Sequence, residues 1–154
     1  MIKVLFICHG NICRSPMAEF VMKYIAEQRG LSISVDSCAT STEELGNPVH
    51  YGTVQKLKEV GIPMYPHFAR QLTKKDYKET DYLIAMDSNN LRNIERLIGK
   101  DKDSKVHLLL DFAERKGQSI ADPWYTGNFD VTYDDIKEGC EGLADFLSGK
   151  IKKS

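Results

Sequence analysis

Hydrophobic residues are almost continuous from Ile2 to Ile7, without alternation of apolar and polar positions. A short unbroken run of this kind is typical of a strand that is buried on both faces of a parallel sheet. After Ser15 and Pro16, which suit the cap and first position of a helix, apolar residues recur at helical spacing until Gly30. The chain is therefore predicted to begin with a strand, a loop and a helix.

The same order of elements recurs along the rest of the chain. Further strands are predicted at residues 32–36, 82–86 and 106–110, and further helices begin near Asn47, Ser88 and Thr132. Alternating strands and helices with right-handed crossovers form a parallel sheet that has helices on both faces. We therefore expect an α/β fold with a doubly wound, four-stranded parallel sheet, in one domain over residues 1–154.

Two segments are the first places to search for a site. Ligands of doubly wound sheets bind beyond the carboxyl ends of the strands, which points to the loop after the first strand. The segment from Asp111 to Asp130 is long and weakly periodic, as functional loops often are. It contains Asp122, Trp124 and Tyr125.

In the helix that is predicted to begin near Asn47, Tyr51 is expected on the buried face.

Composition excludes several classes of protein. The hydrophobic fraction of 42% is too high for a disordered chain, and the net charge of −1 provides no overall positive field for nucleic acid or an anionic membrane. No apolar run approaches the roughly 20 residues that span a bilayer. A cytoplasmic protein is expected, and export without a leader stays open.

The four cysteines form no Cys-x-x-Cys pair and no Cys/His pattern with zinc spacing, so a structural zinc site has little support. No cofactor is expected. Cys38 and Cys140 are predicted to be ordinary buried residues. Cys8 and Cys13 lie in the loop between the first strand and the first helix. Their chemistry depends on that loop.

The loop and the start of the helix read Cys8-His9-Gly10-Asn11-Ile12-Cys13-Arg14-Ser15-Pro16. A loop that runs into a helix N-terminus gathers backbone N–H groups and favours a dianion such as phosphate. Gly10 and Asn11 tolerate the backbone conformations that a tight loop needs, and Arg14 can hold two phosphate oxygens. The same field favours a thiolate, which makes Cys8 a candidate nucleophile.

This segment resembles the signature of the low-molecular-weight protein tyrosine phosphatases: Cys, five residues, Arg, then Ser or Thr and usually Pro. The resemblance continues over nearly the whole chain, at Asp36-Ser37, His67 with Ala69-Arg70-Gln71, Met86-Asp87 with Asn90-Leu91, and Asp122-Pro123-Trp124-Tyr125. It implies a metal-independent hydrolase that acts on phosphotyrosine proteins or peptides and releases inorganic phosphate. A monomer or weak dimer is expected.

The resemblance also implies roles for individual residues. Cys8 would attack phosphorus to form a cysteinyl-phosphate, while Asp122 protonates the departing phenolate and later activates water. Arg14 and the loop would stabilise the phosphate charge. The supporting hydrogen-bond network would consist of Asn11, Ser15, Ser37 and His67. The substrate cleft would be lined by Ile12, Glu43, Trp124 and Tyr125.

Cys13 and the loop after Ser37 carry separate expectations. Cys13 is either a packing residue or the partner of Cys8 in a reversible disulfide, as the second loop cysteine can be in this family. Eukaryotic members commonly have an aromatic residue in the loop after Ser37, whereas this chain has Glu43 and Glu44 there. Acidic residues weaken the stacking of a substrate ring on that wall.

Four other functions are alternatives. Arsenate reductases share the loop but need further cysteines after the third strand, and residues 87–97 contain none. Phosphoarginine phosphatases typically have a small Thr where this chain has Ile12. A non-catalytic phosphotyrosine-binding module could lack the thiol or the acid, yet Cys8 and Asp122 are both present. A thiol oxidoreductase that uses Cys8 and Cys13 would leave Arg14 and Asp122 without a function.

Overall fold

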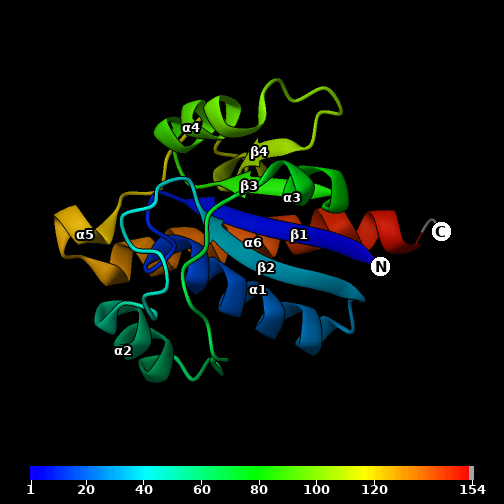
Figure 1. The fold of residues 1–154 in the computed structure, drawn as a ribbon. Coiled ribbons are helices and arrows are strands. Elements are labelled where there is room, and N and C mark those ends of the chain that lie inside the picture. The colour runs from blue at the N-terminus through cyan, green and yellow to red at the C-terminus, as the bar shows by residue number, and fades with distance from the viewer. Residues whose placement is uncertain (153–154) are drawn as a thin grey trace.

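The computed structural model describes residues 1–152, which form a four-stranded sheet with helices on both faces (Figure 1). The strands are β1 (Ile2–Cys8), β2 (Ile33–Ala39), β3 (Tyr82–Ala85) and β4 (Val106–Leu108). Their order is β2-β1-β3-β4, and each neighbouring pair is parallel. The predicted α/β fold is confirmed. The direction of winding reverses at β1, so a crevice is expected beyond its carboxyl end.

Helices join the strands and cover the sheet. They are α1 (Arg14–Arg29), α2 (Tyr51–Glu59), α3 (Lys74–Glu79), α4 (Ser88–Ile98), the 3₁₀-helix η1 (Leu109–Ala113), α5 (Pro123–Thr126) and α6 (Phe129–Lys152). Val4 and Phe6 pack in the core with α1 and α6, whereas Leu5 and Ile7 pack in a second core with Ile94 of α4. Because both faces of β1 are buried, its apolar run does not alternate with polar residues.

The N-terminus of α1 differs from the prediction. The helix begins at Arg14 and its cap position is Cys13, so the predicted cap at Ser15 is wrong. The Ser15 hydroxyl instead contacts Cys8 and Asn11. Pro16 lies in the first turn, where a helix can accept a residue without an N–H group.

The start of α2 was also predicted too early. Residues 47–48 are held by the segment before α3, because Asn47 O accepts from Ala69 N and Pro48 forms a bridge with Phe68. The helix therefore begins at Tyr51, whose side chain is 73% exposed rather than buried.

Three further differences concern elements with little periodicity. β4 ends at Leu108, and Leu109 and Leu110 turn into η1 instead of extending the strand. α6 begins three residues before the predicted Thr132, at Phe129, and its first turn is capped by Asn128 Oδ1, which accepts from Val131 N. α3 was not predicted, since none of its six residues is buried. None of the helices over residues 1–152 is long and apolar enough to cross a membrane.

A close approach between α6 and η1 fixes the start of the segment that leads to α5. A Cβ atom added at Gly142 of α6 would overlap the backbone carbonyl of Phe112 in η1. A backbone group cannot move aside as a flexible side chain can. The absence of a side chain at Gly142 is therefore a requirement of this packing.

We expect Gly142→Ala to lower the free energy of unfolding by about 1–3 kcal/mol, since a methyl group must be forced into a filled space. Gly149 lies in the same helix with nothing within 4 Å of an added Cβ. Gly149→Ala should therefore stabilise the protein by up to about 1 kcal/mol through helix propensity. Chemical denaturation of the two variants measures both effects, and a similar change in the two would contradict the close approach.

Candidate active site

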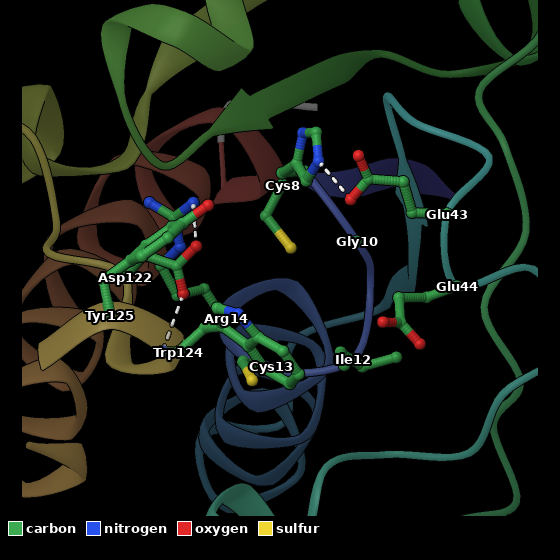
Figure 2. A pocket seen from close by; sticks show the side chains of 11 residues that line it. Cys8, Gly10, Ile12, Cys13, Arg14, Glu43, Glu44, Asp122, Trp124 and Tyr125 are labelled. Atoms are coloured by element: carbon green, nitrogen blue, oxygen red, sulfur yellow. Dashed lines mark hydrogen bonds and ion pairs between the residues drawn. The ribbon is translucent and has the colours of Figure 1, made fainter. Parts of the chain in front are cut away.

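Cys8 is the last residue of β1 and points into the crevice at the carboxyl edge of the sheet (Figure 2). Its Sγ lies 3.0 Å from Ser15 Oγ and 3.3 Å from the backbone nitrogen of Asn11. The side chain is buried. Two hydrogen-bonding groups therefore converge on a sulfur atom that is otherwise enclosed by the loop.

Asn11 holds the loop in its curved form. Its φ of 59° lies in the left-handed region, which asparagine tolerates better than most residues. The side-chain Nδ2 donates to Ser15 Oγ at 2.8 Å and to Ser37 Oγ at 3.0 Å. Its Oδ1 lies 2.9 Å from His67 Nε2 and accepts from Arg70 N at 3.3 Å. The structure thus brings together the four residues of the predicted network.

Glu19 sets the direction of the hydrogen bonds in this network. An ionised carboxylate only accepts, so Ser37 Oγ must donate its proton to Glu19 Oε1, which lies at 2.6 Å. The Ser37 oxygen then accepts from Asn11. Because Asn11 also donates to Ser15, the Ser15 proton remains available for Cys8 Sγ. Glu19 thus sets the donor and acceptor roles of Ser37, Asn11 and Ser15, and through them the hydrogen bond that reaches Cys8 Sγ.

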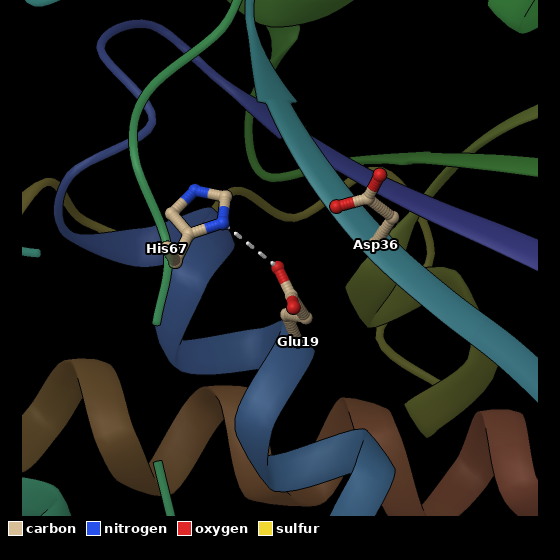
Figure 3. Close-up of side chains that lie close together, drawn as sticks. All are labelled: Glu19, Asp36 and His67. Atoms are coloured by element: carbon tan, nitrogen blue, oxygen red, sulfur yellow. Dashed lines mark ion pairs between the residues drawn. The ribbon is translucent and has the colours of Figure 1, made fainter. Parts of the chain in front are cut away.

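His67, a member of this network, also lies close to Glu19 (Figure 3). Its Nδ1 is 3.5 Å from Glu19 Oε1, while its Nε2 faces Asn11. Burial lowers the pKa of His67, and although the charge of Glu19 acts in the opposite direction, burial is the larger effect. A neutral imidazole can still donate its Nε2–H to Asn11 Oδ1.

Glu19, Asp36 and His67 are close enough to be tested as a metal site, since their ligand atoms lie within 4.8 Å of one another. However, Lys23 Nζ lies 2.7 Å from Glu19 and Arg70 Nη2 lies 3.1 Å from Asp36. Two cations already balance the two carboxylates. The group is therefore better described as an ion-pair cluster than as a metal site.

Arg14 is the buried cation of the site, with 2% of its side chain exposed. Its Nη1 donates to Asp87 Oδ2 at 2.7 Å and to the Ile120 carbonyl at 2.8 Å, and its Nη2 lies 3.5 Å from Asp122 Oδ2. Burial alone would lower the pKa of Arg14, but the negative charges of Cys8 and Asp87 raise it above its ordinary value. The guanidinium is thus charged and oriented.

A cavity of about 90 Å³ opens above the loop (Figure 2). It is lined by Cys8, His9, Gly10, Ile12, Cys13, Arg14, Glu43, Glu44, Asp122, Trp124 and Tyr125. Asp122 is the cap residue of α5 and accepts from Trp124 N at 3.0 Å. Trp124 and Tyr125 follow it and are 57% and 83% exposed. All predicted cleft residues therefore lie at this cavity.

Cys13 lines the cavity but is buried and reduced, as are the other three cysteines. Burial and, secondarily, the charge of Cys8 raise the pKa of Cys13 to about 12. Burial also raises the pKa of Cys38 and of Cys140. Cys13 is therefore a protonated thiol at neutral pH, and its predicted redox role stays a prediction.

Comparison with known proteins identifies the family of this chain. The model of the low molecular weight phosphotyrosine protein phosphatase family matches residues 3–153. The chain belongs to this family. It is 42% identical over 146 residues to the low molecular weight protein-tyrosine-phosphatase YfkJ of Bacillus subtilis, covering 93% of this chain and 94% of that protein.

Two other matches extend the comparison. The human low molecular weight phosphotyrosine protein phosphatase is 40% identical over 146 residues, which cover 91% of this chain and 92% of the human protein. The crystal structure of YfkJ from Bacillus subtilis superposes with a TM-score of 0.93 at 40% identity, covering 97% of this chain and 96% of that structure. The α/β fold of this phosphatase is thus that of a solved family member.

Sequence reasoning missed two carboxylates of the phosphatase site. Glu19 lies one helical turn after Ser15 and so faces the loop, a relation that the i, i+4 spacing could have indicated. Asp87 follows β3, whose carboxyl end is adjacent to that of β1, and this adjacency also carried a signal. Asp87 was named only as part of the segment Met86-Asp87 that resembles the family, without a role, and Glu19 was not singled out.

We expect Ser37→Ala to destabilise the protein by about 1–3 kcal/mol, because it leaves an oxygen of Glu19 and an N–H of Asn11 without their buried partner. Ser34 is exposed on the same strand, so Ser34→Ala should change stability by less than about 0.5 kcal/mol. Chemical denaturation compares the two. Equal losses would show that the buried network contributes nothing specific.

Proposed function

We propose that this chain hydrolyses phosphotyrosine in proteins or peptides through a cysteinyl-phosphate intermediate and releases inorganic phosphate. The observation that carries the proposal is the position of Cys8 Sγ, which is contacted by Ser15 Oγ and Asn11 N at the bottom of a cavity that Arg14 and Asp122 also line. This arrangement combines a nucleophile, an anion-binding loop and an acid. Family membership supports the same activity.

Phosphate would be held by the loop and by Arg14. No side chain forms a hydrogen-bonded cap at the N-terminus of α1, so its first N–H groups are available to an anion. Asp87 and the Ile120 carbonyl hold Arg14 through Nη1, and the remaining N–H donors can bind phosphate oxygens. Donors that are fixed in advance stabilise the transition state without reorganisation.

The reaction would proceed in two steps. In the first, the Cys8 thiolate forms a bond to phosphorus while the bond from phosphorus to the phenolic oxygen breaks, and Asp122 gives that oxygen its proton. In the second, water attacks phosphorus, Asp122 takes a proton from the water, and the bond between phosphorus and sulfur breaks. The Ser15 hydroxyl would stabilise the thiolate as it departs. Inorganic phosphate and the starting enzyme result.

The shape of the cavity favours an aryl phosphate. Ile12 supplies an apolar surface beside the loop, and Trp124 and Tyr125 supply aromatic faces at the mouth. A planar phenyl ring can pack between such groups. Trp124 is itself oriented by His50, whose ring it meets edge to face with the centroids 5.6 Å apart. A thiol oxidoreductase would leave Arg14 and Asp122, which also line the cavity, without a function.

Turnover of phosphotyrosine, phosphoserine and phosphoarginine peptides tests the proposal. We expect release of phosphate from the phosphotyrosine peptide by the wild-type protein and its loss in Cys8→Ser, because an alcohol at this position is a far weaker nucleophile. Cys140→Ser is not a suitable control, since that thiol is fully buried. The exposed Ser34→Ala variant is suitable. Turnover that persists in Cys8→Ser, or that favours phosphoarginine, would contradict the proposal.

The role of Asp122 predicts an effect that depends on the leaving group. Asp122→Asn keeps an oxygen that can cap α5 but cannot donate a carboxylic proton. We expect it to slow phenyl phosphate hydrolysis by about 10²- to 10⁴-fold, and p-nitrophenyl phosphate much less, because nitrophenolate leaves without a proton. The measurement is the initial rate of the wild type and of Asp122→Asn on each of the two substrates. Equal losses would remove the assignment of Asp122 as the acid.

A further inference from the structure

The cavity has walls of different character. On one side α5 presents the aromatic rings of Trp124 and Tyr125, and on the other the loop after β2 presents Glu43 and Glu44 (Figure 2). The side chain of Glu43 is 70% exposed, which places its carboxylate at the rim rather than at the bottom. An acidic rim is unexpected around a site that binds a dianion.

The charges of the cavity are separated by depth. Among its described lining residues, Arg14 is the side chain with a permanent positive charge, and it is buried and paired with Asp87 and Asp122. The two glutamates face the mouth without a lysine or arginine partner among the side chains of residues 1–151. A bound phosphate group would thus lie near positive charge at the floor of the cavity. The substrate residues on either side of the phosphotyrosine would lie near negative charge at the rim.

The acidic wall is held in place. His9 Nε2 lies 3.0 Å from Glu43 Oε2, and Asn47 Nδ2 donates to the Glu44 carboxylate. The loop backbone is anchored at both ends, because Ser41 N donates to the His9 carbonyl at 3.0 Å and Gly46 N donates to the Ala69 carbonyl at 2.8 Å. The two carboxylates therefore occupy defined positions and can contribute to recognition.

We propose that Glu43 and Glu44 select phosphotyrosine substrates that carry lysine or arginine next to the phosphotyrosine. When the phosphorylated ring fills the cavity, the peptide backbone must cross the mouth, so its flanking side chains reach the rim. A cationic side chain there meets two carboxylates, and the exposed face of Trp124 can add a cation–π contact. An acidic flank meets like charge. This inference rests on the proposed function and specifies its substrate class.

The size of the effect follows from the exposure of the rim. Ion pairs between exposed groups contribute about 0.2–1 kcal/mol each, which corresponds to about 1.4- to 5-fold in an equilibrium or rate ratio. Two such pairs on a basic substrate, set against repulsion of an acidic one, give an expected preference of about 3- to 30-fold. The discrimination should appear in kcat/KM, because it involves parts of the substrate that do not react.

The test compares two phosphotyrosine peptides of equal length, one with lysine and one with glutamate on both sides of the phosphotyrosine. We expect the lysine peptide to be preferred by about 3- to 30-fold in kcat/KM by the wild type, and by less than about 2-fold by Glu43→Gln/Glu44→Gln. The control is Glu27→Gln/Glu95→Gln, which removes the same charge at exposed positions outside the cavity. It should keep the wild-type ratio.

Free phosphotyrosine separates this inference from the proposed function, since it has no flanking residues. One outcome is that the wild type hydrolyses free phosphotyrosine but has nearly equal kcat/KM values for the lysine and glutamate peptides. This result would overturn the role of Glu43 and Glu44 and leave the proposed activity intact. No turnover of any phosphotyrosine substrate would overturn the proposed function itself. Glu44→Gln alone keeps the contact between His9 and Glu43, and it should lower the ratio partway. An unchanged ratio in both Gln variants would also overturn the inference.

Discussion

The left-handed backbone at Asn11 is the constraint on which the rest of the site depends. A non-glycine residue in this conformation is unfavourable unless its surroundings compensate, and here one amide group binds side chains of α1 and β2, together with His67 and the Arg70 N–H. The backbone N–H of Arg70 can only donate, which fixes Oδ1 as the acceptor and Nδ2 as the donor. Three separate parts of the chain must therefore be in place before the loop can close around Cys8.

Carboxylates organise the site from below and from the sides. Glu19 lies under the loop, and Asp87 and Asp122 flank the guanidinium of Arg14. Buried ion pairs of this kind add little net stability, because desolvation offsets their attraction. Their effect is to fix orientation: Arg14 is held by defined acceptors, and it faces the same cavity as Cys8. The close packing of Gly142 against η1 similarly fixes the segment that leads to Asp122.

Much of this could be predicted from the sequence, because the signals are local. The apolar run of β1 fixed a doubly buried strand, and the spacing from Cys8 to Arg14 indicated a phosphate loop before a helix. The roles of Glu19 and Asp87 were not predicted, because each depends on contacts that form only when α1, β2 and β3 are brought together. α3 escaped prediction because a helix without buried residues has no apolar period.

Helix starts were the other weak point. Serine is a residue type that often caps helices, but the Ser15 hydroxyl hydrogen-bonds with Cys8 and Asn11 instead. Asn47 and Pro48 are held by backbone contacts with residues 68 and 69. In both places tertiary contacts overrode a local preference. Asn128, the residue that does cap α6, lies in a segment where several polar residues could have served equally well.

The unequal burial of charge makes the site respond in two ways to ionic strength. Dissolved ions screen exposed charges over a Debye length of about 8 Å at physiological salt, but they screen enclosed charges much less. Arg14 is enclosed by Asp87, Asp122 and the Ile120 carbonyl, whereas Glu43 is in contact with solvent. If the proposed roles hold, salt should weaken discrimination at the mouth while leaving anion capture at the floor largely intact, so that selectivity and catalytic capacity would be set by different parts of one cavity.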